Sequence, residues 1–203
     1  MSVRAFRPES VRPPRGFTPF APPAGALARA PLDLEIGCGV GFHPLRYAGA
    51  HPDRVLIAIE KTREKFGKFA RRYATHGRPA NLVPVHADAV AWVTHALGPA
   101  SLSTVLIPYP NPNPKNPAQR WIRMPFFGYL LTRLKKNGRI VFYTNRPEYA
   151  EEVRVHAVRD WSLRVVRDLE LTKEDFPDGN YRTHFEKKYL ERGERGYEIE
   201  LRF

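Results

Sequence analysis

The chain has 203 residues, which is the length of one domain with a sizeable core. It contains no apolar stretch near the roughly 20 residues that cross a bilayer, and its N-terminus lacks the charged-then-apolar order of a signal peptide. We therefore expect a soluble, cytoplasmic protein that does not contact membranes. The single cysteine, Cys38, excludes an internal disulfide and is expected to be a packing residue.

Net charge is the strongest signal in the composition. Thirty-three Lys and Arg residues against 21 Asp and Glu residues leave a formal net charge of +12. Such a surplus favours a polyanionic partner, for which RNA is the leading candidate. The basic residues are dispersed rather than gathered in one run, so a generally basic surface without such a partner is the alternative.

Prolines and arginines dominate the first 30 residues, in which Glu9 is the only acid. This composition favours extended, poorly packed chain. We predict a flexible N-terminal arm at 1–30 and a single domain at 31–203. The arm either touches phosphates or is an unstructured leader.

The first predicted strand, 32–37, runs into a glycine turn. Glu35 lies near its end, and Gly37, Gly39 and Gly41 follow before a predicted helix. Glycines let the backbone turn tightly and approach a ligand closely, as in nucleotide-type cofactor sites. The spacing G-x-G-x-G after an acid differs from the dinucleotide pattern G-x-G-x-x-G and resembles motif I of the S-adenosylmethionine-dependent methyltransferases. That resemblance implies S-adenosyl-L-methionine as the cofactor.

Strands and helices alternate along the next part of the chain. Repeated units of strand, helix and strand predict a parallel sheet. The predicted strands are 32–37, 54–60, 81–86 and 102–109, and the predicted helices between them are 42–50, 62–76 and 88–97.

The C-terminal part continues the alternation and then changes. A helix is predicted at 119–136, ended by Asn137-Gly138 as a left-handed cap, before a strand at 139–144 and a helix at 147–160. Two closing strands are predicted, at 162–171 and 196–203. The order resembles an α/β fold of the Rossmann-like, seven-stranded class I S-adenosylmethionine-dependent methyltransferase type, in which the last strand inserts antiparallel.

Acidic and amide side chains stand where the predicted strands end. In an open α/β sheet the ligand lies beyond the carboxyl ends of the strands, so Glu35, Glu60, Asp88 and Asn111 are candidate site residues. Glu60 has the position of a carboxylate that accepts hydrogen bonds from both ribose hydroxyls. Asp88 has the position of an acceptor for the adenine amino group, although a helix N-cap is the alternative for it.

Four later segments carry a more specific resemblance. They are Leu106-Ile-Pro-Tyr-Pro-Asn-Pro-Asn-Pro-Lys115, Gln119-Arg-Trp-Ile-Arg-Met-Pro-Phe126, Thr144-Asn145 and Thr183-His-Phe-Glu186. In order and spacing the chain resembles the tRNA (guanine-N7)-methyltransferases over roughly 32–203. The late Thr-x-Phe-Glu is the most discriminating piece, because general methyltransferases do not carry it.

The resemblance implies roles for particular residues. Glu35, Gly37, Gly39, Gly41, Glu60, Asp88 and Asn111 would bind S-adenosyl-L-methionine. Asn111 would also be the catalytic, acceptor-orienting residue. The substrate guanosine of tRNA would contact Lys115, Asn145, Thr183, His184, Phe185 and Glu186.

Two positions depart from the family pattern. The aspartates of its P-D-P-W and T-D motifs are Asn111 and Asn145 here. Each exchange removes a negative charge from a site whose product, 7-methylguanine, is cationic, and changes the hydrogen bonds offered to a base. The acceptor is therefore either tRNA or, in a divergent paralogue, a ring nitrogen of a small purine-like heterocycle. A non-catalytic RNA-binding protein is the third hypothesis.

The expected chemistry requires neither a general base nor a metal. N7 of guanine has a lone pair and no proton, so catalysis by positioning is sufficient. His43, His86, His95 and His184 are scattered without the spacing of metal ligands, so no metal site is expected. The sequence leaves open whether the protein is a monomer or a homodimer.

Overall fold

The computed structural model describes residues 4–203, which form an α/β domain around one seven-stranded sheet. The sheet order is β3-β2-β1-β4-β5-β7-β6. Neighbouring strands from β3 to β5 are parallel, while β7 is antiparallel to both β5 and β6. The strands are β1 Leu32–Ile36, β2 Val55–Glu60, β3 Leu82–His86, β4 Leu102–Pro108, β5 Leu134–Thr144, β6 Arg164–Leu171 and β7 Gly196–Arg202. The predicted fold class and the antiparallel last strand are confirmed.

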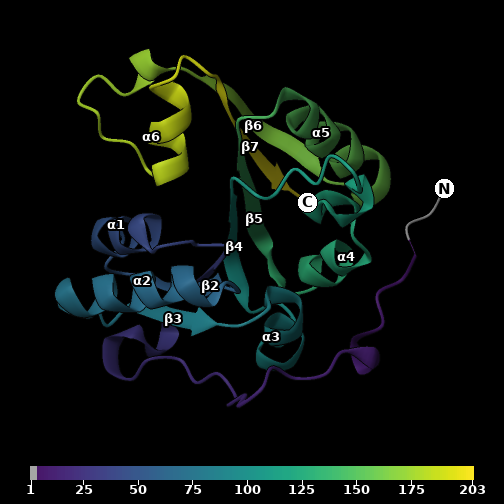
Figure 1. The fold of residues 1–203 in the computed structure, drawn as a ribbon. Helices are drawn as coiled ribbons and strands as arrows, with labels where there is room; N and C mark the ends of the chain where they lie inside the picture. Colours follow the sequence, from purple (N-terminus) through teal and green to yellow (C-terminus); the bar gives the residue numbers. More distant parts are fainter. Residues whose placement is uncertain (1–3) are drawn as a thin grey trace.

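Helices cover the sheet from both sides (Figure 1). The faces have separate apolar clusters, one including Phe69 and Ala48 and the other including Phe127 and Tyr149. The first face carries α1 Phe42–Ala50 and α2 Arg63–Thr75, and the second carries α3 Ala89–Ala96, α4 Pro125–Leu131 and α5 Pro147–Trp161. Helix α6, His184–Leu190, lies apart from both layers, above α1 in Figure 1.

The helix predicted at 119–136 is wrong. Short 3-10 turns at Pro117–Gln119 and Trp121–Arg123 precede α4, which begins only at Pro125 and ends at Leu131. Proline has no N–H to donate and holds the preceding residue in an extended conformation, so it starts this helix instead of continuing an earlier one.

The predicted left-handed cap at Asn137-Gly138 is also wrong. Both residues lie within β5, and the pairing of β5 with β4 shifts register between Leu102 and Thr104. Strand β5 therefore begins at Leu134, before the start at 139 that the sequence predicts. Sequence pattern alone does not separate a glycine at an irregularity in a strand from a glycine that ends a helix.

The N-terminal segment contacts the domain through aromatic side chains. Phe6 packs edge-on against Phe126, with ring centroids 5.3 Å apart, and Phe20 packs against Trp92 at 6.0 Å. Apart from turns at Pro8–Ser10 and Gly25–Arg29, residues 4–30 have no helix or strand. The flexible arm stays a prediction, and its residues 1–3 lie outside the described part of the chain.

Within residues 4–203, no helix is long and apolar enough to cross a membrane. The same residues contain no group of three or more His, Cys, Asp or Glu side chains arranged to hold a metal ion.

Candidate active site

A tight turn between β1 and α1 forms the floor of a groove. Gly37, Gly39 and Gly41 have positive φ angles of 80°, 61° and 79°. A Cβ on Gly41 would overlap the ring of Phe69, whereas a Cβ on Gly37 or Gly39 would meet none of the described atoms. Gly41 is therefore needed for packing α1 on α2, and the other two glycines leave the backbone open to a ligand.

Glu60, at the carboxyl end of β2, is locked onto this turn. Its Oε2 accepts a hydrogen bond from the Gly39 N–H at 2.9 Å, and its Oε1 accepts one from the Thr62 N–H at 2.6 Å. The side chain is buried, yet it lines the groove beside Gly37 and Asn111. Each carboxylate oxygen has a further lone pair, so Glu60 can still accept hydrogen bonds from a ligand.

Glu35, in β1, lies under a neighbouring cavity of about 230 Å³. Its carboxylate is 1% exposed, and Oε2 lies 2.7 Å from Nδ1 of His43. Oε1 has no hydrogen-bond partner among the described residues. A buried carboxylate oxygen without a donor is unfavourable, and native proteins rarely leave one unfilled unless a ligand completes it.

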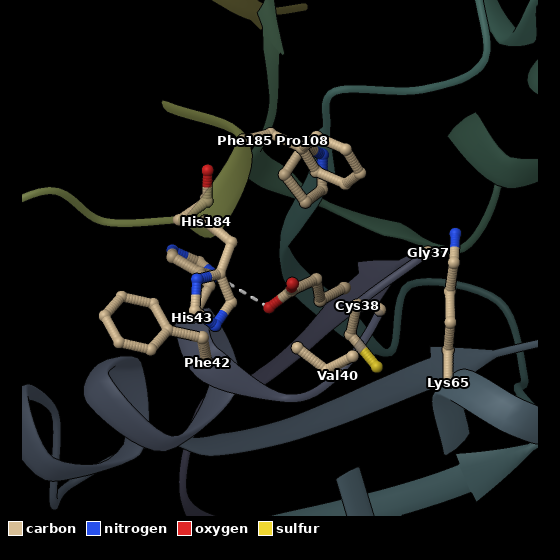
Figure 2. Close-up of a pocket in the computed structure, with 12 residues that line it drawn as sticks. Gly37, Cys38, Val40, Phe42, His43, Lys65, Pro108, His184 and Phe185 are labelled. Carbon is tan, nitrogen blue, oxygen red and sulfur yellow. Dashed lines mark hydrogen bonds and ion pairs between the residues drawn. The ribbon is translucent and has the colours of Figure 1, made fainter. Parts of the chain in front are cut away.

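The cavity above Glu35 is closed by residues from distant parts of the chain. Figure 2 shows His184 and Phe185, from α6, facing the turn residues Cys38 and Val40 across it. The remaining wall is made by Gly37, Gly39, Phe42, His43, Lys65, Pro108 and Thr183.

Cys38 is a packing residue of this wall, as the sequence predicts. Burial raises the pKa of its thiol, and the nearby carboxylates of Glu35 and Glu60 raise it further. A thiol that stays neutral is a weak nucleophile. The geometry therefore assigns it no covalent chemistry.

The segment between the last two predicted strands contains α6. Thr183 is the N-cap of this helix, and its hydroxyl accepts a hydrogen bond from the Glu186 N–H at 2.9 Å. The ring of His184 packs at a tilt against Phe42 of α1, with centroids 4.6 Å apart. Burial lowers the pKa of His184, and the charges of Arg72 and Lys187 lower it further, so the ring is neutral at pH 7.

Glu186 does not reach the cavity. It is fully buried, and its carboxylate accepts hydrogen bonds from the Arg182 guanidinium at 2.6 and 3.0 Å and from the Arg182 backbone N–H at 2.7 Å. Arg182 also pairs with Glu198 in β7 and lies over the ring of Tyr143. The structure thus uses Glu186 to fix the start of α6, and Arg182 is a residue that the sequence analysis missed.

Asn111 belongs to the second part of the groove. Its Oδ1 accepts a hydrogen bond from the Asn113 N–H at 3.0 Å, which holds the proline-rich turn after β4. Asn111 lines the same hollows as Glu60 and Trp121. This arrangement brings Asn111 together with the predicted cofactor residues.

Asp88 is the N-cap of α3. Its Oδ1 accepts hydrogen bonds from the N–H groups of Val90 and Ala91, and its Oδ2 pairs with Lys61 at 2.8 Å. The helix N-cap, given above as the alternative role of Asp88, is therefore observed. Asp88 also lines the groove beyond Glu60, with its side chain 40% exposed, so a contact with adenine stays a prediction.

The other two predicted substrate residues differ in position. Asn145 lines the groove near Tyr109, and its Nδ2 donates a hydrogen bond to Glu194 Oε2 at 2.8 Å. Lys115 is exposed in a turn and lines none of the cavities described here for residues 4–203. A substrate contact by Lys115 stays a prediction.

These features fit a bound nucleoside cofactor. Carboxylates lie at the carboxyl ends of β1 and β2, and the backbone at Gly37 and Gly39 leaves room for a ligand. Glu35 Oε1 lies beneath the cavity as an acceptor without a donor among the described residues. Crevices at the carboxyl ends of parallel strands are the usual ligand sites of open α/β sheets. The fold and the site together define the class I S-adenosylmethionine-dependent methyltransferases.

Comparison with solved structures agrees with this class. "Structure of an Antibiotic Related Methyltransferase" aligns with a TM-score of 0.61 and 16% identity, covering 84% of this chain and 86% of the other. A methyltransferase from Thiobacillus denitrificans, in complex with S-adenosyl-L-homocysteine, aligns with a TM-score of 0.54 and 13% identity, covering 85% and 84%. At such low identity these similarities establish the fold alone.

Sequence comparison is more specific. The family described as "Putative methyltransferase" matches residues 29–199. The tRNA (guanine-N(7)-)-methyltransferase of Anaeromyxobacter dehalogenans is 30% identical over 172 residues, which is 84% of each chain. The enzyme of that name from Nitrosomonas eutropha is 34% identical over 60% of this chain, and that from Mycolicibacterium gilvum is 30% identical over 79%.

The matches span 54% and 63% of the length of the last two relatives. The family match nevertheless extends over most of the chain, from the strand before the glycine turn to β7. The chain belongs to the family of the tRNA (guanine-N7)-methyltransferases.

Proposed function

We propose that the protein transfers a methyl group from S-adenosyl-L-methionine to N7 of a guanosine in tRNA. The observation that carries the proposal is the groove in which Glu35, Glu60 and the open glycine turn lie beneath Thr183-His184-Phe185. Membership of the family supports both the cofactor and the reaction.

The residues at the strand ends would hold the cofactor. Glu60 would accept hydrogen bonds from the ribose hydroxyls and Asp88 from the adenine amino group, while Glu35 Oε1 would accept one from the ammonium group of the methionine part. When bound, S-adenosylmethionine supplies an electrophilic methyl group on a sulfonium. Gly37 and Gly39 would let the cofactor approach the backbone without steric conflict.

The acceptor base would enter the second part of the groove. Tyr109 and Phe185 provide aromatic surface there, with ring centroids 6.1 Å apart, and base stacking on such rings contributes about 1–3 kcal/mol. Burial raises the pKa of Tyr109, and the Glu186 carboxylate raises it further, so its hydroxyl stays protonated.

No proton has to leave N7. Asn111 and Asn145 would orient the base, and holding the reacting atoms in line can supply roughly 7–11 kcal/mol of the barrier. The protein therefore acts by positioning.

Basic side chains near the groove would contact tRNA phosphates. Lys65 of α2 lines the cavity, and Arg72 of the same helix lies against His184. Lys187 and Lys188 are exposed on α6. We propose that the predicted arm, residues 1–30 with five arginines, also contacts tRNA phosphates, and that the site of action is the cytoplasm.

A labelling experiment tests the proposal. Methyl-tritiated S-adenosylmethionine and bulk tRNA are incubated with the protein, and the nucleosides are then separated. We expect label in 7-methylguanosine, with transfer falling steeply as salt rises because counterions are released on RNA binding. A Glu35→Ala variant is the control.

Label in tRNA no higher than with Glu35→Ala would end the tRNA assignment. The small-heterocycle alternative, which the loss of two carboxylates at Asn111 and Asn145 favours, predicts instead transfer to free purine bases with little dependence on salt. A non-catalytic RNA-binding protein would bind tRNA and label neither acceptor.

A further inference from the structure

His43 is the second residue of α1 and lies between two cavities. It lines the cavity above Glu35 and also a separate cavity on the far side of its ring, together with Tyr143, Arg139 and Arg182. The residue is 8% exposed. Its ring is held between Tyr47 and Tyr143, with centroids 5.9 and 6.5 Å away. The packing fixes the orientation of the imidazole.

The fixed ring determines how the Glu35 carboxylate lies. Nδ1 of His43 is 2.7 Å from Glu35 Oε2, the hydrogen bond drawn as a dashed line in Figure 2. With Oε2 held in this way, the carboxylate cannot rotate without losing a buried hydrogen bond. Oε1 is left as an acceptor that no donor among the described residues fills.

A cationic ligand that donates a hydrogen bond would best satisfy Glu35 Oε1. The carboxylate is almost fully withdrawn from water, and a buried charge is stabilised only by a paired and hydrogen-bonded partner. Lys65 lines the same cavity, but no ion pair joins it to Glu35 in the described part of the chain. An ammonium group on a ligand would supply both the charge and the hydrogen-bond donor.

We infer that His43 is a positioning residue for the amino-acid end of the cofactor. Nδ1–H donates to Glu35 Oε2 and thereby presents Oε1 to the ammonium group of the methionine part. This inference rests on the proposed function, because it takes S-adenosylmethionine as the ligand. It assigns His43 no contact with the cofactor and no proton transfer.

Two ligands separate positioning from general packing. S-adenosylhomocysteine has the amino-acid end, and 5′-methylthioadenosine lacks it. Calorimetric titrations of both are compared for the wild type, His43→Leu and His43→Asn. Asparagine can place an N–H donor close to the position of Nδ1, whereas leucine keeps the bulk without the donor.

Without the donor that holds the Glu35 carboxylate in place, His43→Leu should bind S-adenosylhomocysteine roughly tenfold more weakly. Its affinity for 5′-methylthioadenosine should be unchanged, and His43→Asn should restore most of the affinity for S-adenosylhomocysteine. His51→Leu is the matched control, because His51 caps the other end of α1.

Equal binding of S-adenosylhomocysteine by the wild type and His43→Leu would overturn the inference, as would an equal loss for both ligands. A wild type that binds neither ligand would instead contradict the proposed function, and the inference with it. The protonation state of the ring gives a test that does not depend on the variants' folding. Nitrogen NMR of the wild-type histidines should show Nδ1 of His43 protonated, and an unprotonated Nδ1 would also overturn the inference.

Discussion

The groove has a proposed cofactor half, at Glu35, Glu60 and the glycine turn, and a proposed acceptor half, at Tyr109, Phe185 and the start of α6. Different kinds of interaction hold the two halves. In the cofactor half, backbone groups fix Glu60, which accepts hydrogen bonds from the N–H groups of Gly39 and Thr62. In the acceptor half, a buried ion pair does this work, because Arg182 joins Glu186 at the start of α6 to Glu198 in β7. A site built from a local backbone motif has a short sequence signature, and a site built from distant side chains does not.

The two halves also differ in the elements that form the walls of the cavity. The cofactor half is built on the central sheet, because Glu35 and Glu60 lie in β1 and β2 and the glycine turn follows β1 directly. Helix α6 instead reaches the cavity from beyond both helix layers and contacts α1 through the packing of His184 against Phe42. We therefore expect substitutions in the acceptor half to change the stability of the protein as well as substrate binding.

The largest effect is expected on removing the buried ion pair. Arg182→Met would leave Glu186 and Glu198, both buried, without their shared partner. Removing one partner of a buried ion pair costs about 3–5 kcal/mol. Because Arg182 is partly exposed, we expect its removal to lower the free energy of unfolding by about 3 kcal/mol. Urea unfolding measures it.

Arg192→Met is the matched control, since Arg192 is exposed just after α6 and should change stability by no more than about 0.5 kcal/mol. If Arg182→Met unfolds at the same urea concentration as this control, α6 is held by something other than the ion pair.

A smaller effect is expected from restoring a charge near the acceptor. Asn111→Asp puts a carboxylate beside the position where positive charge develops on the purine, so transfer to guanosine should rise several-fold to about tenfold. The rate is measured with saturating cofactor. Asn116→Asp, which adds the same charge to an exposed position in the same loop, should leave it unchanged.

An unchanged or lower rate in Asn111→Asp would show that charge at this position does not limit the reaction.

The sequence predicted most of the cofactor half. The alternation of strands and helices, the glycine turn and the acids Glu35 and Glu60 at the strand ends all follow from local pattern, because parallel strands bring their carboxyl ends to one edge. The family resemblance, which the comparisons confirm, pointed to the segment that closes the cavity.

Long-range contacts account for what was missed. Arg182 and Glu186 are four residues apart, a spacing that allows a pair, but nothing in the sequence indicates that Glu198, in β7, joins them. His43 read as one scattered histidine because its partner, Glu35, lies in the preceding strand. The false helix at 119–136 arose because Pro125 begins a helix that was expected to start earlier.

We propose that the carboxylates of Glu35 in β1 and Glu60 in β2 bind S-adenosylmethionine. Calorimetric titration of S-adenosylhomocysteine into the wild type and Glu60→Gln tests it most directly, with Glu64→Gln, an exposed acid on α2, as the control. Loss of hydrogen bonds to a charged acceptor predicts binding about tenfold to 100-fold weaker for Glu60→Gln and unchanged for Glu64→Gln. Wild-type affinity in Glu60→Gln would contradict the claim.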